Sequence, residues 1–289
     1  MKRLIWLPVA LLLAAVSGCG YESAHAEGKI NVVATTTQVA DLARNVGGAR
    51  VHVVQLLAPN ADPHAYELRP HDMAAVAEAD VVLRSGGDVD AWLDEAIDGS
   101  GTRARVVTLS DGIKLRGDDP HWWQDPRNAE IAAREIGAAL HVDPTPYVQR
   151  LQRLDRAVAR CVGQVPPAQR KLVTTHDALG YYAARYGVDL IGTVIPSLST
   201  AGQPSAGDTA RLIQTIRDSG VRAIFAESSV NPKVEQAIAR ATGAQVGRAL
   251  WADTLGPPGS DGATYIQSIE SNTRALVDGF TGGAVRCRL

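Results

Sequence analysis

The chain lacks an excess of positive charge and has few aromatic side chains. Its 289 residues include 29 Lys and Arg against 31 Asp and Glu, a formal net charge of −2. Proteins that bind nucleic acid usually carry a basic surface, so this balance argues against a nucleic-acid partner. Aromatic residues make up only 5%, yet 45% of the residues are hydrophobic. A soluble globular protein with a sizeable core is therefore expected.

After residue 19 the chain lacks any apolar run near the roughly 20 residues that a membrane-spanning helix needs. Its start differs, because charged Met1–Arg3 precedes apolar Leu4–Val16 and then small residues up to Cys19, the pattern of an export signal. This ending resembles the lipobox of bacterial lipoproteins; plain secretion is the alternative. We expect residues 1–19 to be a lipoprotein signal peptide and residues 20–28 a tether. The mature protein would then lie outside the cytoplasm, held to the cell membrane by lipid on Cys19.

Cysteines are scarce, with three in the whole chain. Cys19 is assigned to the anchor, which leaves Cys161 and Cys287 in an oxidising compartment where a disulfide is permitted. Two buried free thiols are the alternative. We slightly favour the disulfide, although sequence gives no separation between the two Cα atoms.

Two common catalytic motifs are missing as well. The chain has no H-E-x-x-H, which would place two zinc-binding histidines on one helix, and no G-x-S-x-G of serine hydrolases. A zinc hydrolase would also need an open coordination position and a general base. The sequence therefore predicts that the protein is not an enzyme.

Short apolar segments alternate with helical patterns in both halves of the chain. Strands are predicted at residues 30–34, 51–57, 81–83 and 105–109, and again at 171–175, 190–193, 223–226 and 246–250. Helical spacing of apolar residues separates most of them. This alternation is typical of mainly parallel sheets covered by helices on both faces.

Between the two halves, a helical pattern runs from Asp143 to Gly163, roughly 30 Å at 1.5 Å per residue. It is the only predicted helix long enough to span a domain. We interpret the fold class as α/β, with two lobes joined by one long rigid helix. The predicted boundaries are 29–142 for the N-terminal lobe, 143–166 for the interlobe helix and 167–289 for the C-terminal lobe.

Four potential metal ligands follow predicted strands: His64, His121, His176 and Asp253. Ligands of parallel sheets bind at the carboxyl ends of the strands, so the four would converge if the lobes face each other. Three imidazoles and a carboxylate suit zinc or a neighbouring transition metal. Four protein ligands leave no coordination position for a catalytic water, so the sequence favours a site that holds the metal.

Each residue also has a structural interpretation. His64 could be a loop histidine, His176 a hydrogen-bonded histidine at a strand end, and Asp253 a helix cap or turn residue. His121 lies in a stiff loop between two prolines and beside Trp122–Trp123, which we expect to pack around the loop; a solvated turn is the alternative. Four such placements on one sheet edge favour the metal site.

These stretches resemble a known family, the metal-binding solute receptors of zinc and manganese ABC importers. Pro63–Glu67 resembles its PHxYE motif, Asp119–Pro126 its DPHxWxDP motif, His176–Tyr182 its HxAxxY motif and Trp251–Leu255 its C-terminal DxL motif. The similarity runs in order over residues 29–280.

The resemblance implies the function of a receptor. It implies two α/β lobes with a rigid interlobe helix, metal capture outside the membrane and delivery to an ABC permease. It also carries the ligand role onto His64, His121, His176 and Asp253. We expect a monomer.

The third ligand position separates the metals within this family. Manganese receptors usually have glutamate there and zinc receptors histidine, so His176 favours Zn2+, with Mn2+ as the alternative. The chain lacks the long His-rich loop that often precedes the second histidine of zinc receptors, which weakens that preference. A surface adhesin or metal buffer with the same site is a further alternative.

Overall fold

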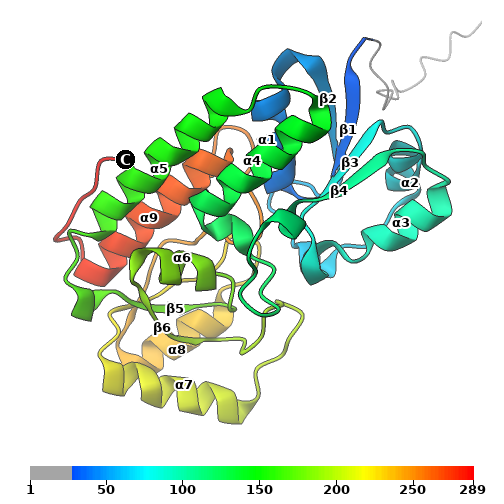
Figure 1. Ribbon diagram of the computed structural model, residues 1–289. Helices are drawn as coiled ribbons and strands as arrows, with labels where there is room; N and C mark the ends of the chain where they lie inside the picture. Colours follow the sequence, from blue (N-terminus) through cyan, green and yellow to red (C-terminus); the bar gives the residue numbers. More distant parts are fainter. Residues whose placement is uncertain (1–27) are drawn as a thin grey trace, which may run out of the picture.

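A four-stranded parallel sheet forms the centre of the N-terminal lobe in the computed structural model, which describes residues 28–289 (Figure 1). Its strands are β1 (Ile30–Ala34), β2 (Val51–Gln55), β3 (Val81–Arg84) and β4 (Arg105–Thr108), in the order β2-β1-β3-β4. Val32 of β1 lies opposite Val53 on one side and Val81 on the other. These apolar strands are covered on both faces, as the prediction of four parallel strands required.

Helices cover both faces of this sheet. They are α1 (Thr37–Gly47), α2 (Pro70–Ala77), α3 (Leu93–Ser100) and α4 (Pro126–Leu140). Helices α1 and α4 pack together on one face and α2 and α3 on the other. Thr36 caps α1 by accepting a hydrogen bond from the Val39 N–H, and Asp125 caps α4 in the same way through Arg127.

The C-terminal lobe repeats the strand order in a less complete sheet. Its strands form two parallel pairs, β5 (Lys171–Thr174) with β6 (Asp189–Thr193) and β7 (Ala223–Ile224) with β8 (Gln245–Val246). A bridge between Thr174 and Phe225 joins the pairs, which gives the order β6-β5-β7-β8. The predicted strands at 223–226 and 246–250 exist but are shorter, because the chain leaves the ladder after Val246 and returns only at the Glu227–Leu250 bridge.

Four helices complete this lobe: α6 (Gly180–Tyr186), α7 (Ala206–Ser219), α8 (Lys233–Thr242) and α9 (Tyr265–Thr281). Leu212 and Ile216 of α7 and Ile238 of α8 pack against Val173 and Ile224 of the strands. Among residues 28–289, no helix is both long and apolar enough to cross a membrane.

A second long helix packs beside the one that connects the lobes. The predicted interlobe helix is present as α5 (Thr145–Val162), with 18 residues. The prediction that it is the only long helix is wrong, because α9 has 17 residues and lies along α5 (Figure 1). Leu151 of α5 and Leu276 of α9 belong to one hydrophobic core that also includes Leu42 and Leu172 from the two lobes. The buried core is therefore continuous between the lobes.

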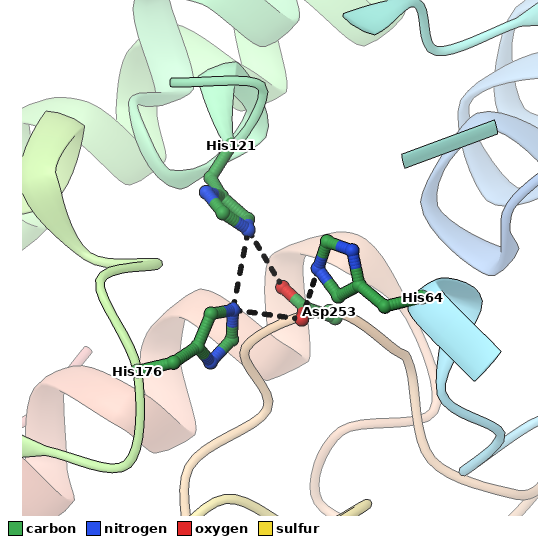
Figure 2. Close-up of side chains that lie close together, drawn as sticks. All are labelled: His64, His121, His176 and Asp253. Carbon is green, nitrogen blue, oxygen red and sulfur yellow. Dashed lines mark hydrogen bonds and ion pairs between the residues drawn. The ribbon is translucent and has the colours of Figure 1, made fainter. Parts of the chain in front are cut away.

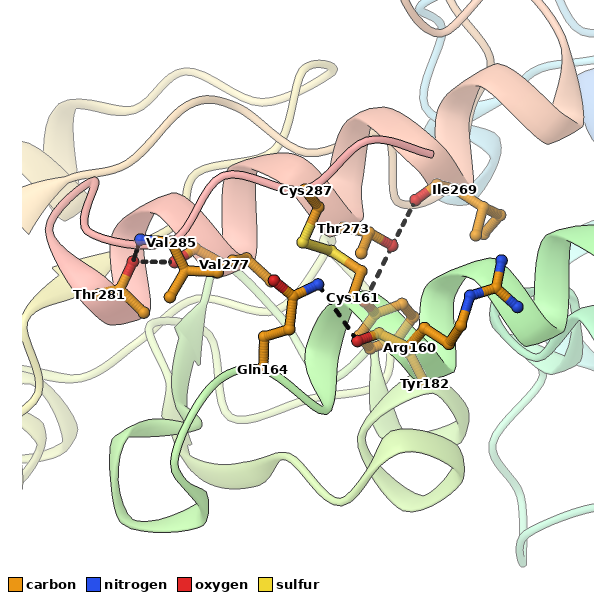
Figure 3. The surroundings of a disulfide bond; sticks show 10 residues. All are labelled: Arg160, Cys161, Gln164, Tyr182, Ile269, Thr273, Val277, Thr281, Val285 and Cys287. Atoms are coloured by element: carbon orange, nitrogen blue, oxygen red, sulfur yellow. Dashed lines mark hydrogen bonds between the residues drawn. A yellow bond between two sulfur atoms is a disulfide. The ribbon is translucent and has the colours of Figure 1, made fainter.

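A disulfide joins the end of α5 to the C-terminal tail (Figure 3). It links Cys161 and Cys287, whose Cα atoms are 5.5 Å apart and which are separated by 126 positions in the sequence. The expected signal peptide, lipidated Cys19 and nearly all of the tether lie outside the described residues.

Candidate metal centre

The structure brings together all four residues that the sequence singled out (Figure 2). His64 lies in a short 3-10 helix, Pro63–Ala65, after β2, and His121 lies in the loop after β4. His176 closely follows β5, and Asp253 lies in the loop after β8. Each contributes one potential ligand atom, and these atoms all lie within 4.8 Å of one another.

The Asp253 carboxylate lies at the centre of the group. Its Oδ2 is 3.3 Å from Nε2 of His64 and 3.1 Å from Nε2 of His176, and its Oδ1 is 3.4 Å from Nε2 of His121. The Nε2 atoms of His121 and His176 are 3.3 Å apart. The side chains of His121, His176 and Asp253 are fully buried, and that of His64 is 4% exposed.

Two buried carboxylates orient two of the imidazoles. Nδ1 of His121 donates to Asp119 at 2.8 Å, and Nδ1 of His176 donates to Glu227 at 2.7 Å. The same carboxylate oxygens also accept the backbone N–H of each histidine. Because Nδ1 carries the proton in both rings, Nε2 presents its lone pair to the centre when the ring is neutral.

The centre is suited to a cation. Asp253 Oδ1 and Oδ2 and His64 Nε2 are buried, and none of them has a partner with hydrogen-bond geometry among the described residues. Burial alone would lower the pKa of His176, but the nearby charge of Asp253 and the hydrogen bond to Glu227 raise it to about 11. Burial alone would raise the pKa of Asp253, but the charges of His176 and His121 hold it well below its usual range. The carboxylate thus attracts a positive charge, either a proton on His176 or a metal ion.

Hydrogen bonds connect the loop of His121 to the loop of Asp253. The indole N–H of Trp123 and the side-chain amide of Gln124 both donate to the carbonyl of Ala252, at 2.9 Å and 2.7 Å. Trp122 donates to the Ser85 carbonyl at 3.1 Å. Trp122 and Trp123 are 0% and 2% exposed, which agrees with the expectation that they pack around the loop. These contacts join ligands from opposite lobes.

Sequence reasoning missed the roles of Asp119 and Glu227. Glu67, the carboxylate of the first motif, is exposed. Burial, followed by the charge of Asp119, raises the pKa of Asp177. A signal for Glu227 was present, because it follows β7 at the same edge as the ligands.

The other histidines within the described chain lie away from this centre. His52 is in β2, His71 is in α2, and His141 ends α4 in a left-handed conformation with φ of 53°. His25 lies outside the described residues.

Residues 32–279 match the family model described as zinc-uptake complex component A, periplasmic. The chain belongs to this family. The zinc-uptake component A family is the one whose motifs the sequence resembles, so that resemblance is confirmed. Its members are substrate-binding receptors of ABC transporters, not enzymes.

Named relatives cover nearly the whole chain. The manganese-binding lipoprotein MntA of Bacillus subtilis is 31% identical, over 96% of this chain and 98% of its own length. The zinc-binding protein TroA of Treponema pallidum is 29% identical, over 94% and 95%.

Solved structures show the same architecture. The TroA structure superimposes with a TM-score of 0.79 at 28% identity, covering 88% of this chain and 99% of TroA. The laminin-binding protein Lmb of Streptococcus agalactiae gives a TM-score of 0.77 at 26% identity, covering 86% and 98%. The predicted two-lobed α/β fold is confirmed by these matches.

Proposed function

We propose that this protein captures a divalent transition metal outside the cytoplasm, with zinc the preferred ion, and delivers it to an ABC permease for import. The observation that carries the proposal is the convergence of three imidazoles on one buried carboxylate. His64, His121, His176 and Asp253 would each supply one ligand atom. Three neutral rings and one carboxylate give the ligand set a charge of −1, so the bound dication keeps a net positive charge that Asp119 and Glu227 offset.

The ligand set favours retention of a metal over chemistry on it. Four protein ligands complete a tetrahedral zinc site, so no coordination position is left for a reacting water. The family of receptors supports the same conclusion. We therefore infer that the metal is cargo and that the protein is not an enzyme.

Zinc is proposed over manganese because nitrogen ligands suit zinc better than the harder manganese ion. The relatives include both a manganese-binding and a zinc-binding protein, so their names do not select between the two ions. The donor set carries the preference: three of the four ligands are imidazoles.

The proposed location is the outer side of the cell membrane. Several relatives are named lipoproteins of metal ABC transporters, which supports a lipid anchor at Cys19 and a membrane permease as partner. The continuous core across α5 and α9 supports lobes that move only modestly when metal binds.

The test is the metal content of purified, metal-stripped protein after zinc and manganese are offered together, read by mass spectrometry. Each of the four proposed ligands is changed to Ala in turn, and His52→Ala serves as the control for losing a histidine elsewhere. We expect one equivalent of zinc in the parent and the control, and a weakening of roughly a hundredfold or more in each ligand variant. One equivalent of manganese would keep the site but assign manganese instead of zinc. The absence of stoichiometric metal would refute the proposal that the protein is a metal receptor.

An adhesin with the same centre is the second candidate. Lmb, described as a bifunctional protein with adhesin and metal-transporting activity, shares this fold. Deletion of the gene distinguishes the two: loss of metal uptake supports the receptor, whereas loss of surface attachment with unchanged uptake supports the adhesin.

A further inference from the structure

One flank of the molecule carries six exposed arginines. Four recur at spacings of three and four residues along α5 and so share one face of that helix, and two more lie on the C-terminal tail. They are Arg150, Arg153, Arg156, Arg160, Arg286 and Arg288. We call this surface the arginine flank.

The fold holds the two parts of the arginine flank together. The disulfide between Cys161 and Cys287 ties the tail to the end of α5 (Figure 3). Arg286 and Arg288 precede and follow Cys287 in the sequence. The four arginines of α5 line a groove of about 510 Å³ that also contacts Glu270 of α9 and ends at Leu289.

Within the described chain the arginine flank forms no close ion pairs, although burial raises the pKa of Asp41 and the charge of Arg150 lowers it in part. Within residues 28–289, none of the six guanidinium groups forms an ion pair with a carboxylate. Exposed arginines elsewhere do form such ion pairs, for example Arg211 with Asp208. Glu270, the acidic residue of the groove, lies 3.6 Å from Arg274 of its own helix. On a chain with a net charge of −2, this segregation of charge marks a surface for an anionic partner.

The arginine flank begins near the point where the chain enters the fold and runs away from it, along α5 to the C-terminal tail (Figure 1). Ile30, the first residue of β1, is opposite Val51, and the neighbouring Arg50 donates to the carbonyl of His141, shortly before α5. The start of β1 and the first turns of α5 are therefore at one edge of the molecule (Figure 1). The metal ligands lie at the other ends of the strands.

We propose that the arginine flank docks on the anionic phospholipid headgroups of the membrane that anchors the protein. The choice of partner rests on the lipid anchor of the proposed function. Between Cys19 and Ile30 the chain can span at most about 40 Å, so the bilayer stays within reach of the flank. Clusters of four to eight basic residues on the cytoplasmic side of membranes bind anionic lipids, and the same electrostatic attraction acts at any leaflet that contains such lipids. Guanidinium groups bind phosphate through paired N–H donors. Docking would keep the metal ligands on the side away from the bilayer.

The experiment measures sedimentation with vesicles, without metal and without the anchor. It uses residues 28–289. The solved TroA chain, which is a folded unit, is matched over 99% of its length, so we expect this part to fold without the anchor. One vesicle set contains about one third anionic phospholipid and the other only zwitterionic lipid. The variant R153Q/R156Q/R160Q removes three charges from the flank. The control R211Q/R217Q/R240Q removes three charges from α7 and α8, at the far end of the C-terminal lobe.

We expect binding to anionic vesicles only, weakened at least tenfold by the flank variant and less than twofold by the control, since each arginine near an anionic bilayer contributes roughly fivefold. Binding should also fall at high ionic strength. Equal weakening by both variants would mean that only net charge matters and would overturn the proposal. A parent protein that does not bind anionic vesicles would also overturn it, and would point to an acidic protein as the partner of the flank. Zinc stoichiometry, measured on the same variants, reports separately on the metal centre.

Discussion

The two lobes share a strand order but differ in how completely their sheets are formed. The N-terminal sheet is a continuous ladder of four strands, whereas the C-terminal one consists of two pairs joined by a single bridge. The metal centre shows the opposite contrast, because the less regular C-terminal lobe supplies two ligands that are both fully buried. The C-terminal ligands His176 and Asp253 are fully buried, and His176 is held by a carboxylate that is distant in sequence. The N-terminal His64 keeps some exposure.

This contrast teaches that a regular sheet is not what holds a ligand in place. Glu227 accepts two hydrogen bonds from His176 across the junction between β5 and β7, where the ladder is thinnest. His121 depends on Asp119, only two residues away. The imidazole of His176 is therefore oriented by a tertiary contact and that of His121 by a local one, although the loop of His121 is itself bonded to Ala252 of the other lobe.

The largest effect expected in the comparison of the two lobes comes from removing the disulfide. We expect the double substitution Cys161→Ala/Cys287→Ala to lower the free energy of unfolding by about 2–4 kcal/mol, because a bridge closing a long loop restricts the unfolded chain. Hydrogen exchange should accelerate more in α9 and the C-terminal lobe than in the N-terminal sheet. Treating the parent with reductant provides the control. A uniform increase in exchange, or no change in stability, would contradict the expectation.

The next effect tests the two carboxylates that orient the imidazoles. Glu227→Ala should weaken zinc binding by roughly 10–100-fold, because it releases the ring of His176 and leaves its Nδ1 proton unpaired. Asp119→Ala should weaken zinc binding less, since the prolines around His121 already restrict that loop. Competition titration with a chelator measures both.

Glu235→Gln is the matched control for this pair. Glu235 is also a buried glutamate of the C-terminal lobe, but it accepts from Thr175 rather than from an imidazole. If Asp119→Ala proves as costly as Glu227→Ala, the distinction between local and tertiary support for the ligands is lost.

The smallest expected effect is a tenfold loss of zinc affinity for each unit by which the pH is lowered. In the metal-free protein the pKa of His176 is raised to about 11, above its ordinary value of 6.5, so the folded protein holds a proton that metal must displace. Affinity should therefore fall about tenfold for each unit of decreasing pH between roughly 9 and 6.5, with about one proton released per ion at pH 7. Calorimetry in buffers of different ionisation enthalpy counts that proton.

Stability of the metal-free protein should change in the opposite sense. A folded pKa above the unfolded one contributes stability that is fully present below pH 6.5 and is lost as the pH rises through about 11. His176→Gln should remove most of both pH effects, whereas His52→Gln should retain them. Proton release that persists in His176→Gln would place the displaced proton on another group.

Much of the fold was predictable because its signals are local. Apolar strands between helices predicted all eight strands and their parallel arrangement, and helical spacing predicted α5 nearly to its ends. Strand lengths were predicted less well: β7 and β8 have two residues each, because pairing depends on a neighbour that the sequence pattern does not contain. The position of α9 along α5 was missed for the same reason.

The sequence by itself determined which side chains could bind metal and at which edge of the sheets they would lie. Strand ends mark that edge, and the prolines around His121 restrict its loop. Only the tertiary structure decided that the four side chains meet within 4.8 Å, that Glu227 orients His176 and that Cys161 reaches Cys287. The reason is physical: local pattern sets the conformation of a segment, but distances between segments far apart in the chain are set by how their buried faces pack.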